Sequence, residues 1–261
     1  MFREESLTLF RNKGYNMEKF YVRLADKVVA VSANYATTKR FCQGYLIEEI
    51  PDEVDIEVCV TLQDVVEEQE KAAKAELGPY SNNYLETLAL HRKVSEELTK
   101  YHTVLFHGSA IAVDGEVYLF TAPSGTGKST HARLWREHFG ERAFMVNDDK
   151  PFLHLQEDGQ MIVYGAPWDG KHHLSRNVGL PLKGICIIVQ AEENRIQKLT
   201  KKESLQEIYL QTYRTITNPK SMKETLEVLT GLLSQPLYRL ECNISQEAVK
   251  LSYEAMSGRK Y

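Results

Sequence analysis

The chain has 261 residues and a formal net charge of −4, with 32 Lys and Arg against 36 Asp and Glu. Hydrophobic residues make up 43% and charged residues 26%, which is typical of a globular protein and excludes a disordered chain, a collagen-like repeat and a small disulfide scaffold. The slightly acidic balance offers no overall positive field for nucleic acid, and the longest aliphatic stretch, 185–189, is too short to span a bilayer.

The first 100 residues are expected to form a small α+β accessory region. Residues 1–16 contain no apolar segment typical of a secretion signal, so we expect a cytoplasmic protein with neither membrane nor nucleic acid as a partner. Short runs of β-branched and aromatic residues predict strands at 19–24, 27–33 and 55–60. Helices are predicted at 35–46, where Gly44 is expected to stop the helix, and at 62–78 and 84–101.

Residues 101–261 alternate between strand and helix patterns and are expected to form the core domain. Strands are predicted at 103–113, 116–122, 143–146, 151–155, 161–165, 184–190 and 238–242. Helices are predicted at 127–139, 202–213, 221–234 and 245–256. Turn signals at Asp114-Gly115 and Glu157-Asp158-Gly159 predict two hairpins. The expected fold class is therefore α/β, with a P-loop-containing mixed sheet flanked by helices.

The strongest motif is the segment Ala122–Ser129, which reads APSGTGKS and follows a predicted strand. Its glycines allow the backbone to curl and to approach a ligand closely, and the helix behind it presents free N–H groups to phosphates. Lys128 is expected to reach the β- and γ-phosphates, and the Ser129 hydroxyl to bind Mg²⁺. The predicted nucleotide-binding residues of this segment are Ser124, Gly125, Thr126, Gly127, Lys128, Ser129 and Thr130.

A pair of aspartates, Asp148 and Asp149, follows the next predicted strand. A carboxylate in this position can hold the Mg²⁺ of a bound nucleotide, and a second one can accept a proton from an attacking hydroxyl. Both aspartates are therefore candidate catalytic residues and, with Ser129, candidate metal ligands. The pattern does not separate their roles.

Two weaker signals accompany these motifs. His107 lies within the predicted strand 103–113, which precedes the strand leading to the APSGTGKS segment, and is a candidate catalytic residue. The segment Gly165–His173 combines glycines, a proline and an aromatic with Lys171, which is expected to make a second phosphate contact. The His172-His173 pair lacks the spacing of a zinc-binding helix, and no cysteine lies near a second one, so a zinc site is not expected.

Taken in order, His107-Gly108, Ala122–Ser129 and Asp148-Asp149 resemble the HPr kinase/phosphorylase family and its relatives in the phosphoenolpyruvate carboxykinase-like P-loop group. The likeness covers residues 103–190, and the NDDKP and GAPWDGK segments resemble a group of small bacterial HPr-kinase-like proteins. Residues 1–100 do not resemble the N-terminal domain of true HPr kinases, so HPr itself is not the expected substrate.

The resemblance implies a kinase that transfers the γ-phosphoryl group of Mg-ATP to a hydroxyl, such as a serine of a peptide, a protein or a small molecule. It implies catalytic roles for His107 and for one or both of Asp148 and Asp149, with Lys128 and Ser129 holding phosphate and Mg²⁺. It is also compatible with a homo-oligomer. Two alternatives stay open: a carboxykinase-like enzyme with an arginine-lined pocket, drawn from Arg133, Arg176 and Arg214, and a nucleotide-sensing module without turnover.

Overall fold

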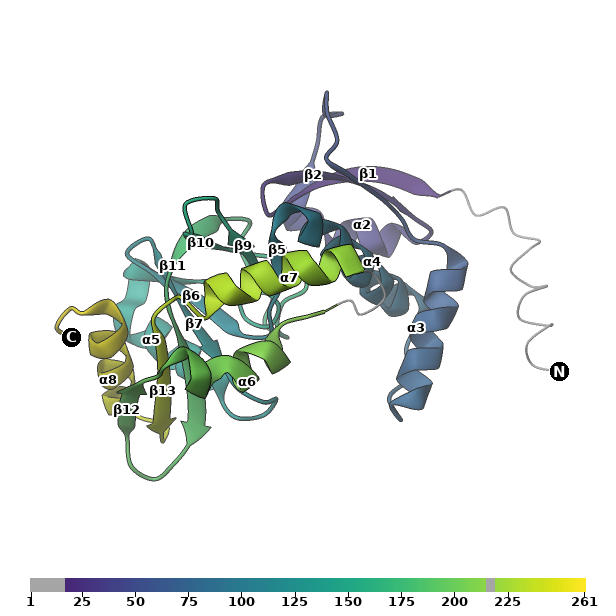
Figure 1. Ribbon diagram of the computed structural model, residues 1–261. Helices are drawn as coiled ribbons and strands as arrows, with labels where there is room; N and C mark the ends of the chain where they lie inside the picture. Colours follow the sequence, from purple (N-terminus) through teal and green to yellow (C-terminus); the bar gives the residue numbers. More distant parts are fainter. Residues whose placement is uncertain (1–16, 215–218) are drawn as a thin grey trace. The chain divides into compact units, whose positions relative to one another are not determined.

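The computed structural model describes residues 17–214 and 219–261 (Figure 1). The chain divides into two compact units, Met1–Val94 and Ser95–Tyr261. Among the described residues, no helix combines the length and the apolar character that crossing a membrane requires.

The described part of the first unit contains a four-stranded sheet in the order β3-β1-β2-β4. The strands are β1 (Glu18–Leu24), β2 (Lys27–Ala33), β3 (Leu46–Ile47) and β4 (Ile56–Cys59). β1 and β2 form an antiparallel hairpin, and β4 pairs with β2 in parallel. Buried and exposed residues alternate along β4, as expected for a sheet that covers a core with one face.

Two longer helices follow this sheet in the chain, α3 (Leu62–Lys74) and α4 (Asn82–Leu98). Glu86 of α4 is fully buried, and its carboxylate accepts hydrogen bonds from the Asn34 main-chain N–H at 2.7 Å and from Thr38 Oγ1 at 2.5 Å. A buried carboxylate needs such donors, so these bonds fix α4 beside the end of β2.

The helix α2 is shorter than the sequence predicts. It spans Ala36–Phe41 instead of 35–46, and Gly44 lies inside a 3₁₀ turn, Gln43–Tyr45, rather than at the helix end. The chain leaves the helix early because the next residues form β3, which pairs with β1. A strand pairing with a distant partner therefore overrides the local preference for helix.

The described part of the second unit contains a nine-stranded mixed sheet. One path of neighbouring strands runs β5-β9-β10-β11-β7-β6-β8, and β13 pairs with both β11 and β12. The strands are β5 (Thr103–Leu105), β6 (Ser109–Val113), β7 (Glu116–Thr121), β8 (Ala143–Asn147), β9 (Phe152–Leu155), β10 (Met161–Tyr164), β11 (Gly179–Gln190), β12 (Arg195–Lys198) and β13 (Leu237–Cys242).

Four strands of this sheet end at the same edge. β7 and β8 are both antiparallel to β6, which lies between them, so their carboxyl ends point the same way. β11 is parallel to β7, and β13 is parallel to β11, so these two strands also end at this edge. The residues that follow the four strands, and those that precede β6, are thereby gathered along one line.

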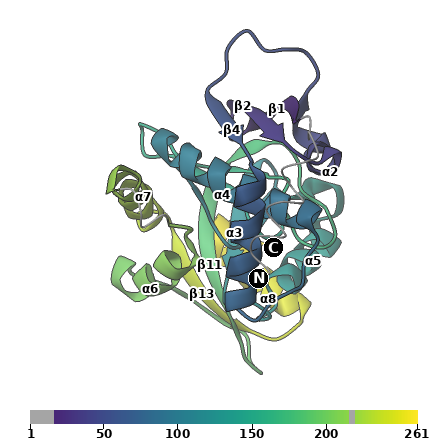
Figure 2. The same ribbon diagram turned by 90° about the vertical axis from the view of Figure 1, so that its right-hand side faces the viewer.

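Helices cover both faces of the sheet, with α6 and α7 on one side and α5 and α8 on the other (Figure 2). Their bounds are Lys201–Gln211 for α6, Pro219–Leu232 for α7, Lys128–Phe139 for α5 and Gln246–Ser257 for α8. One core cluster packs Ile208 and Leu232 against the sheet, and a second packs Trp135 and Tyr253 against its other face. The second unit is therefore an α/β fold with helices on both sides of a mixed sheet.

The apolar run 103–113 is not the single strand that its composition predicts. β5 pairs with β9, whereas β6 pairs with β7 and β8, so the chain changes neighbours at residues 106–108. The main-chain N–H groups there donate outside the strand ladders: Phe106 to Pro151 O, His107 to Gln211 O and Gly108 to Asp149 O. Apolar composition reports burial but not which strand is the partner.

The predicted start of one strand needs correction, and one strand was not predicted. β11 begins at Gly179 rather than at 184, because its first residues pair with β10 before the strand continues between β7 and β13. β12, with the sequence RIQK, was not expected to be a strand because it contains a single apolar residue. Its antiparallel pairing with β13 supplies the order that its composition does not.

Candidate functional site

The loop between β7 and α5 contains two glycines in left-handed conformations, and it leads into the first turn of α5, whose N–H groups have no partner within the helix. β7 ends at Thr121 and α5 begins at Lys128. Gly125 and Gly127 have φ angles of 80° and 109°, a region that residues with a Cβ rarely adopt. The free N–H groups and the positive end of the helix dipole suit an anion placed over this loop.

Lys128, the first residue of α5, is 8% exposed. Its Nζ donates to the carbonyl oxygens of Ala122 at 2.9 Å and Pro123 at 3.3 Å. Burial lowers the pKa of Lys128, and the negative charges of Asp149 and Asp148 partly oppose this shift. The side chain is thus a buried cation next to two carboxylates, and an anionic ligand would stabilise its charge further.

Asp148 follows the end of β8 and is 9% exposed. Ser109 Oγ donates to its Oδ1 at 2.8 Å. Burial is the main cause that raises the pKa of Asp148, and hydrogen bonds from the Ser109 and Ser129 hydroxyls oppose the rise. Ser109 was not recognised in the sequence, where a serine in an apolar run carries no signal of its own.

Asp149 is more accessible and lies beside His107. His107 Nε2 is 3.6 Å from Asp149 Oδ1, and Lys150 Nζ is 3.6 Å from Asp149 Oδ2. The other ring nitrogen of His107, Nδ1, is hydrogen-bonded to Gln211 Oε1 at 2.6 Å. Gln211, the last residue of α6, therefore turns the imidazole toward Asp149. Sequence reasoning missed Gln211 because no local pattern links it to a histidine 104 residues away.

Gly108 allows the chain at His107 to lie close to β7 and to the aspartates. A Cβ at this position would lie 2.8 Å from the carbonyl oxygen of Phe120 and 3.1 Å from Leu119 Cδ1. The Gly108 N–H donates to the carbonyl oxygen of Asp149 at 3.0 Å. The glycine after His107 thus lets the chain pass against β7 and brings His107 next to the aspartates.

Asn147 joins the aspartate pair to the loop after β10. Its Oδ1 accepts from the main-chain N–H groups of Asp149 at 2.9 Å and Lys150 at 2.6 Å. Its Nδ2 donates to the carbonyl oxygens of Ala166 at 3.0 Å and Trp168 at 3.3 Å. Because Asn147 is fully buried, these bonds hold the NDDK and GAPWDGK segments together in a fixed arrangement.

A cavity of about 310 Å³, here called the loop cavity, unites most of the residues predicted from the motifs. It is lined by His107, Ser124, Gly125, Gly127, Lys128, Ser129, Thr130, Asp148, Asp149 and Lys171. Of the predicted site residues only Thr126 lies outside it: its hydroxyl donates to Pro123 O at 2.9 Å, and the residue lines a neighbouring cavity.

That neighbouring cavity, the apolar cavity, has about 360 Å³ and lies on another side of α5. Its apolar lining comes from Leu134, Ile188, Ala191 and Ile244, and it also reaches Thr130 at the start of the helix. Ile188, Ala191 and Ile244 belong to the ends of β11 and β13 or follow them, so this cavity lies along the same sheet edge as the loop cavity.

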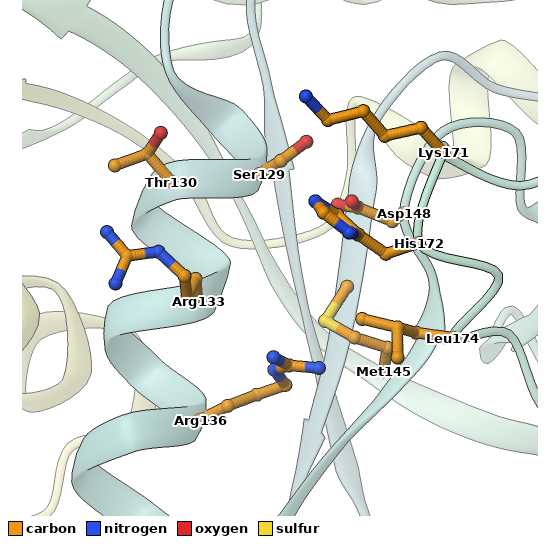
Figure 3. Close-up of a pocket in the computed structure, with 9 residues that line it drawn as sticks. All are labelled: Ser129, Thr130, Arg133, Arg136, Met145, Asp148, Lys171, His172 and Leu174. Carbon is orange, nitrogen blue, oxygen red and sulfur yellow. The ribbon is translucent and has the colours of Figure 1, made fainter.

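A third cavity, of about 420 Å³, lies between α5 and the loop after β10 (Figure 3). We call it the arginine cavity, because Arg133 and Arg136 of α5 line it. The remaining lining residues are Ser129, Thr130, Met145, Asp148, Lys171, His172 and Leu174. It shares Ser129, Thr130, Asp148 and Lys171 with the loop cavity, so the two adjoin.

The three arginines considered for a carboxykinase pocket do not come together. Arg133 lines the arginine cavity. The guanidinium of Arg176 lies over the Phe144 ring at 4.4 Å, and that of Arg214 lies over the Tyr209 ring at 3.9 Å. Each of the latter two stacks on an aromatic side chain outside the described cavities around α5.

In the described part of the chain, no group of three or more His, Cys, Asp or Glu side chains is arranged to hold a metal ion. The Ser129 hydroxyl is hydrogen-bonded to the Asp148 carboxylate where the loop cavity and the arginine cavity adjoin. Such a pair suits Mg²⁺, which binds proteins through one or two oxygen side chains and completes its shell with phosphate oxygens and water.

No protein-family model matches this chain, and no curated protein matches it. Among solved structures, the Hpr(Ser) kinase/phosphatase from Coxiella burnetii is similar at 12% sequence identity and a TM-score of 0.36. The match covers 59% of this chain and 95% of that one. At these values the two structures are only distantly alike.

Proposed function

We propose that this protein is an ATP-dependent phosphotransferase, which moves the γ-phosphoryl group of Mg-ATP to a hydroxyl, and that Ala122–Ser129 is its P-loop. The observation that carries the proposal is the loop cavity, in which an amine, a helix N-terminus and two carboxylates converge. Lys128 and the N–H groups of α5 suit the charge of a triphosphate. Asp148 and Asp149 suit a cation and the proton of an attacking hydroxyl.

The order of the cavities along the sheet edge supports one orientation of the nucleotide. Asp148 follows β8 on one side of β7, whereas Ile188 and Ile244 lie at β11 and beyond β13 on the other side. A nucleotide laid across the loop would bring its base against Leu134 and Ile188 and its terminal phosphate toward the aspartates. An apolar cavity of this size suits a flat aromatic base.

The two aspartates differ in surroundings, which supports different roles. Asp148 is buried beside Ser129, and together they would hold Mg²⁺. When bound, Mg²⁺ neutralises charge that develops on the phosphate oxygens. Asp148 must be ionised to serve as a ligand, so its raised pKa makes this role sensitive to acid.

Asp149 is the group that would accept the proton of the attacking hydroxyl. It is half-exposed, and His107 and Lys150 face its two oxygens. In the transfer, the acceptor oxygen forms a bond to the γ-phosphorus while the bond between that phosphorus and the β,γ-bridging oxygen breaks. ADP leaves, and the hydroxyl proton passes to Asp149. Lys128 balances the charge of the transferring group throughout.

The proposal is tested with purified protein, Mg-ATP labelled in the γ-phosphate, and a panel of hydroxyl acceptors. Lys128→Met should weaken ATP binding about 10–100-fold in calorimetry, because a charged hydrogen-bond donor is lost. Asp149→Asn should leave ATP binding intact and lower transfer about 10²–10⁴-fold, the usual contribution of a general base. Lys250→Met, at an exposed position of α8, serves as the control and should change neither quantity.

Two results would contradict the proposal. If Lys128→Met binds ATP as tightly as the wild type does, the loop does not bind the phosphates. If the wild type releases only inorganic phosphate with every acceptor, the protein is a nucleoside triphosphatase rather than a phosphotransferase.

A further inference from the structure

The arginine cavity carries more positive charge than its neighbours. Arg133 and Arg136 line it from α5, and Lys171 and His172 line it from the facing loop; in Figure 3 the Arg136 side chain extends toward that loop, and the Arg133 guanidinium points away from it. Among the described residues, Asp148 is the one carboxylate that lines it, at the end shared with the loop cavity. Three permanent cations and a histidine around one polar space favour an anionic occupant.

Arg136 is the clearest member of this set. Its side chain extends from α5 toward the strand that carries Met145, across the cavity (Figure 3). Its Nε is buried, and no described residue accepts a hydrogen bond from it. A buried donor without an acceptor costs free energy, and a guanidinium presents its donors in a fork that matches a carboxylate or a phosphate. Because this nitrogen is inaccessible in the observed conformation, a small turn of the guanidinium toward an anion in the cavity would supply the missing acceptor.

Arg133 has a weaker local partner. Its Nη1 donates to Glu137 Oε1 at 2.5 Å, one turn further along α5, and the side chains are 51% and 49% exposed. Exposed pairs of this kind contribute little to stability, so Arg133 can turn to a ligand at small cost.

The position of the cavity indicates which reactant it serves. Residues 129, 133 and 136 lie on one face of α5, and residues 131 and 134 lie on another, which lines the apolar cavity. A nucleotide with its base in the apolar cavity and its phosphates over the loop leaves the arginine cavity free. This cavity opens onto Ser129 and Asp148, beside the proposed transfer site.

We infer that the arginine cavity binds the phosphoryl acceptor, and that the acceptor is a hydroxyl compound with a carboxylate or phosphate group, which Arg136 holds. The inference rests on the proposed function and deepens it. Along α5, Arg133 and Arg136 lie about 6 Å and about 10 Å from Ser129, at 1.5 Å per residue. Arginine side chains reach several ångströms back toward the helix N-terminus. A small acceptor can therefore contact the Arg136 guanidinium with its anionic group while its hydroxyl lies near Ser129.

The test compares acceptors that differ in charge. The probes are N-acetyl-L-serine with its neutral amide, and glycerol 3-phosphate with glycerol, so that the carboxylate and phosphate sources are distinguished. Labelled Mg-ATP is the donor, and kcat/KM is measured for each probe. We expect at least one anionic probe to exceed its neutral counterpart at least about tenfold.

The variants assign that preference to the cavity. Arg136→Gln should raise the KM for the anionic probe about tenfold or more, remove its advantage over the neutral one, and leave the KM for ATP unchanged. Arg136→Lys should restore part of the preference, because it keeps the charge but loses the fork. Arg195→Gln makes the same change at an exposed position of β12 and should behave as the wild type.

Several outcomes would overturn the inference while leaving the proposed function intact. These are equal use of neutral and anionic probes, transfer to neither anionic probe by protein that binds Mg-ATP, and an Arg136→Gln variant that keeps the preference. An Arg136→Gln variant that loses ATP affinity instead would assign the cavity to the nucleotide. Failure of the wild type to bind Mg-ATP would overturn the proposed function itself.

Discussion

Asp148 shows at the scale of one residue how a functional group can oppose stability. Its carboxylate is buried at the end of β8, and burial raises its pKa despite the Ser109 and Ser129 hydroxyls. A raised pKa means that the folded state binds this proton more readily than the unfolded state does. Ionised Asp148 therefore destabilises the ligand-free fold at neutral pH, and this penalty disappears as the pH falls toward the ordinary aspartate range.

Asp148→Asn should raise the melting temperature of the ligand-free protein at pH 7, because the variant has no buried charge. The expected gain is a few degrees, since ~1 kcal/mol shifts the melting temperature of a chain of this size by about 2–4 °C. The gain should shrink as the pH is lowered from 7 toward 4, because a raised pKa lets Asp148 of the wild type take up its own proton before an ordinary aspartate does. Thermal unfolding of both proteins across this pH range measures the effect.

Asp114→Asn provides the opposite case. Arg142 donates two hydrogen bonds to the Asp114 carboxylate and lowers its pKa, so the charged form stabilises the fold. This variant should have a lower melting temperature than the wild type at pH 7. If Asp148→Asn also lowers it at pH 7, the hydrogen bonds of Asp148 outweigh its burial.

At the scale of elements, α5 organises the site through its different faces. Ser129 and Arg136, on one face of α5, line the arginine cavity, and His131, on another face, lines the apolar cavity. The helix is attached to α8 through His131, Trp135 and Ser252: Trp135 Nε1 donates to Ser252 Oγ, and His131 Nε2 is hydrogen-bonded to the same hydroxyl, both at 3.1 Å. The position of the loop thus depends on a buried contact between two helices.

His131 should make this attachment sensitive to acid. Burial lowers the pKa of His131 to about 4 from an ordinary value of 6.5. The neutral ring stabilises the fold fully above pH 6.5, and this contribution is lost as the pH falls toward 4, by roughly 3 kcal/mol in total. His131→Gln should therefore flatten the decline of the free energy of unfolding between pH 6.5 and pH 4, as measured by denaturant titration.

His173→Gln is the matched control, because His173 is exposed on the loop after β10. It should keep the slope of the wild type. An unchanged slope in His131→Gln would mean that another group dominates acid unfolding.

At the scale of the whole molecule, ligand binding should raise the free energy of unfolding, because the site lies where four strands and α5 meet. Mg-ATP at 100 times its dissociation constant should stabilise the folded protein by about 2.7 kcal/mol. This corresponds to a rise of about 5–10 °C in melting temperature. Chelation of Mg²⁺ with EDTA should remove much of the rise, and Lys128→Met, which is expected to bind ATP about 10–100-fold more weakly, should reduce the stabilisation to about 0.4–1.4 kcal/mol at the same concentration. An equal rise with AMP would show that the β- and γ-phosphates contribute nothing.

The elements that follow from local pattern agree best between sequence and structure. The helix over 127–139 appears as Lys128–Phe139, and the hairpin at Asp114-Gly115 joins β6 and β7. Elements whose identity depends on a distant partner were predicted less well, namely the break in 103–113, β3 and β12. Strand pairing is a contact between residues far apart in the chain, and no window of neighbouring residues contains it.

The residues of the candidate site likewise fall into those predicted from local motifs and those that only the fold brings to the site. The motifs pointed to Lys128, Asp148 and Asp149, because each motif is contiguous and its residue types suit phosphate and metal. Ser109 and Gln211, which orient Asp148 and His107, were not expected, since they reach the site only after β6 and α6 are in place.

The sequence by itself determined the turn glycines, the amine and the acid groups, since these depend on side-chain chemistry and on conformations within a few residues. Only the tertiary structure decided that Asp148 is buried while Asp149 faces His107, and that Arg136 lines a cavity beside them. The reason is that burial and proximity result from strand order and helix packing, which join segments that are far apart in the chain.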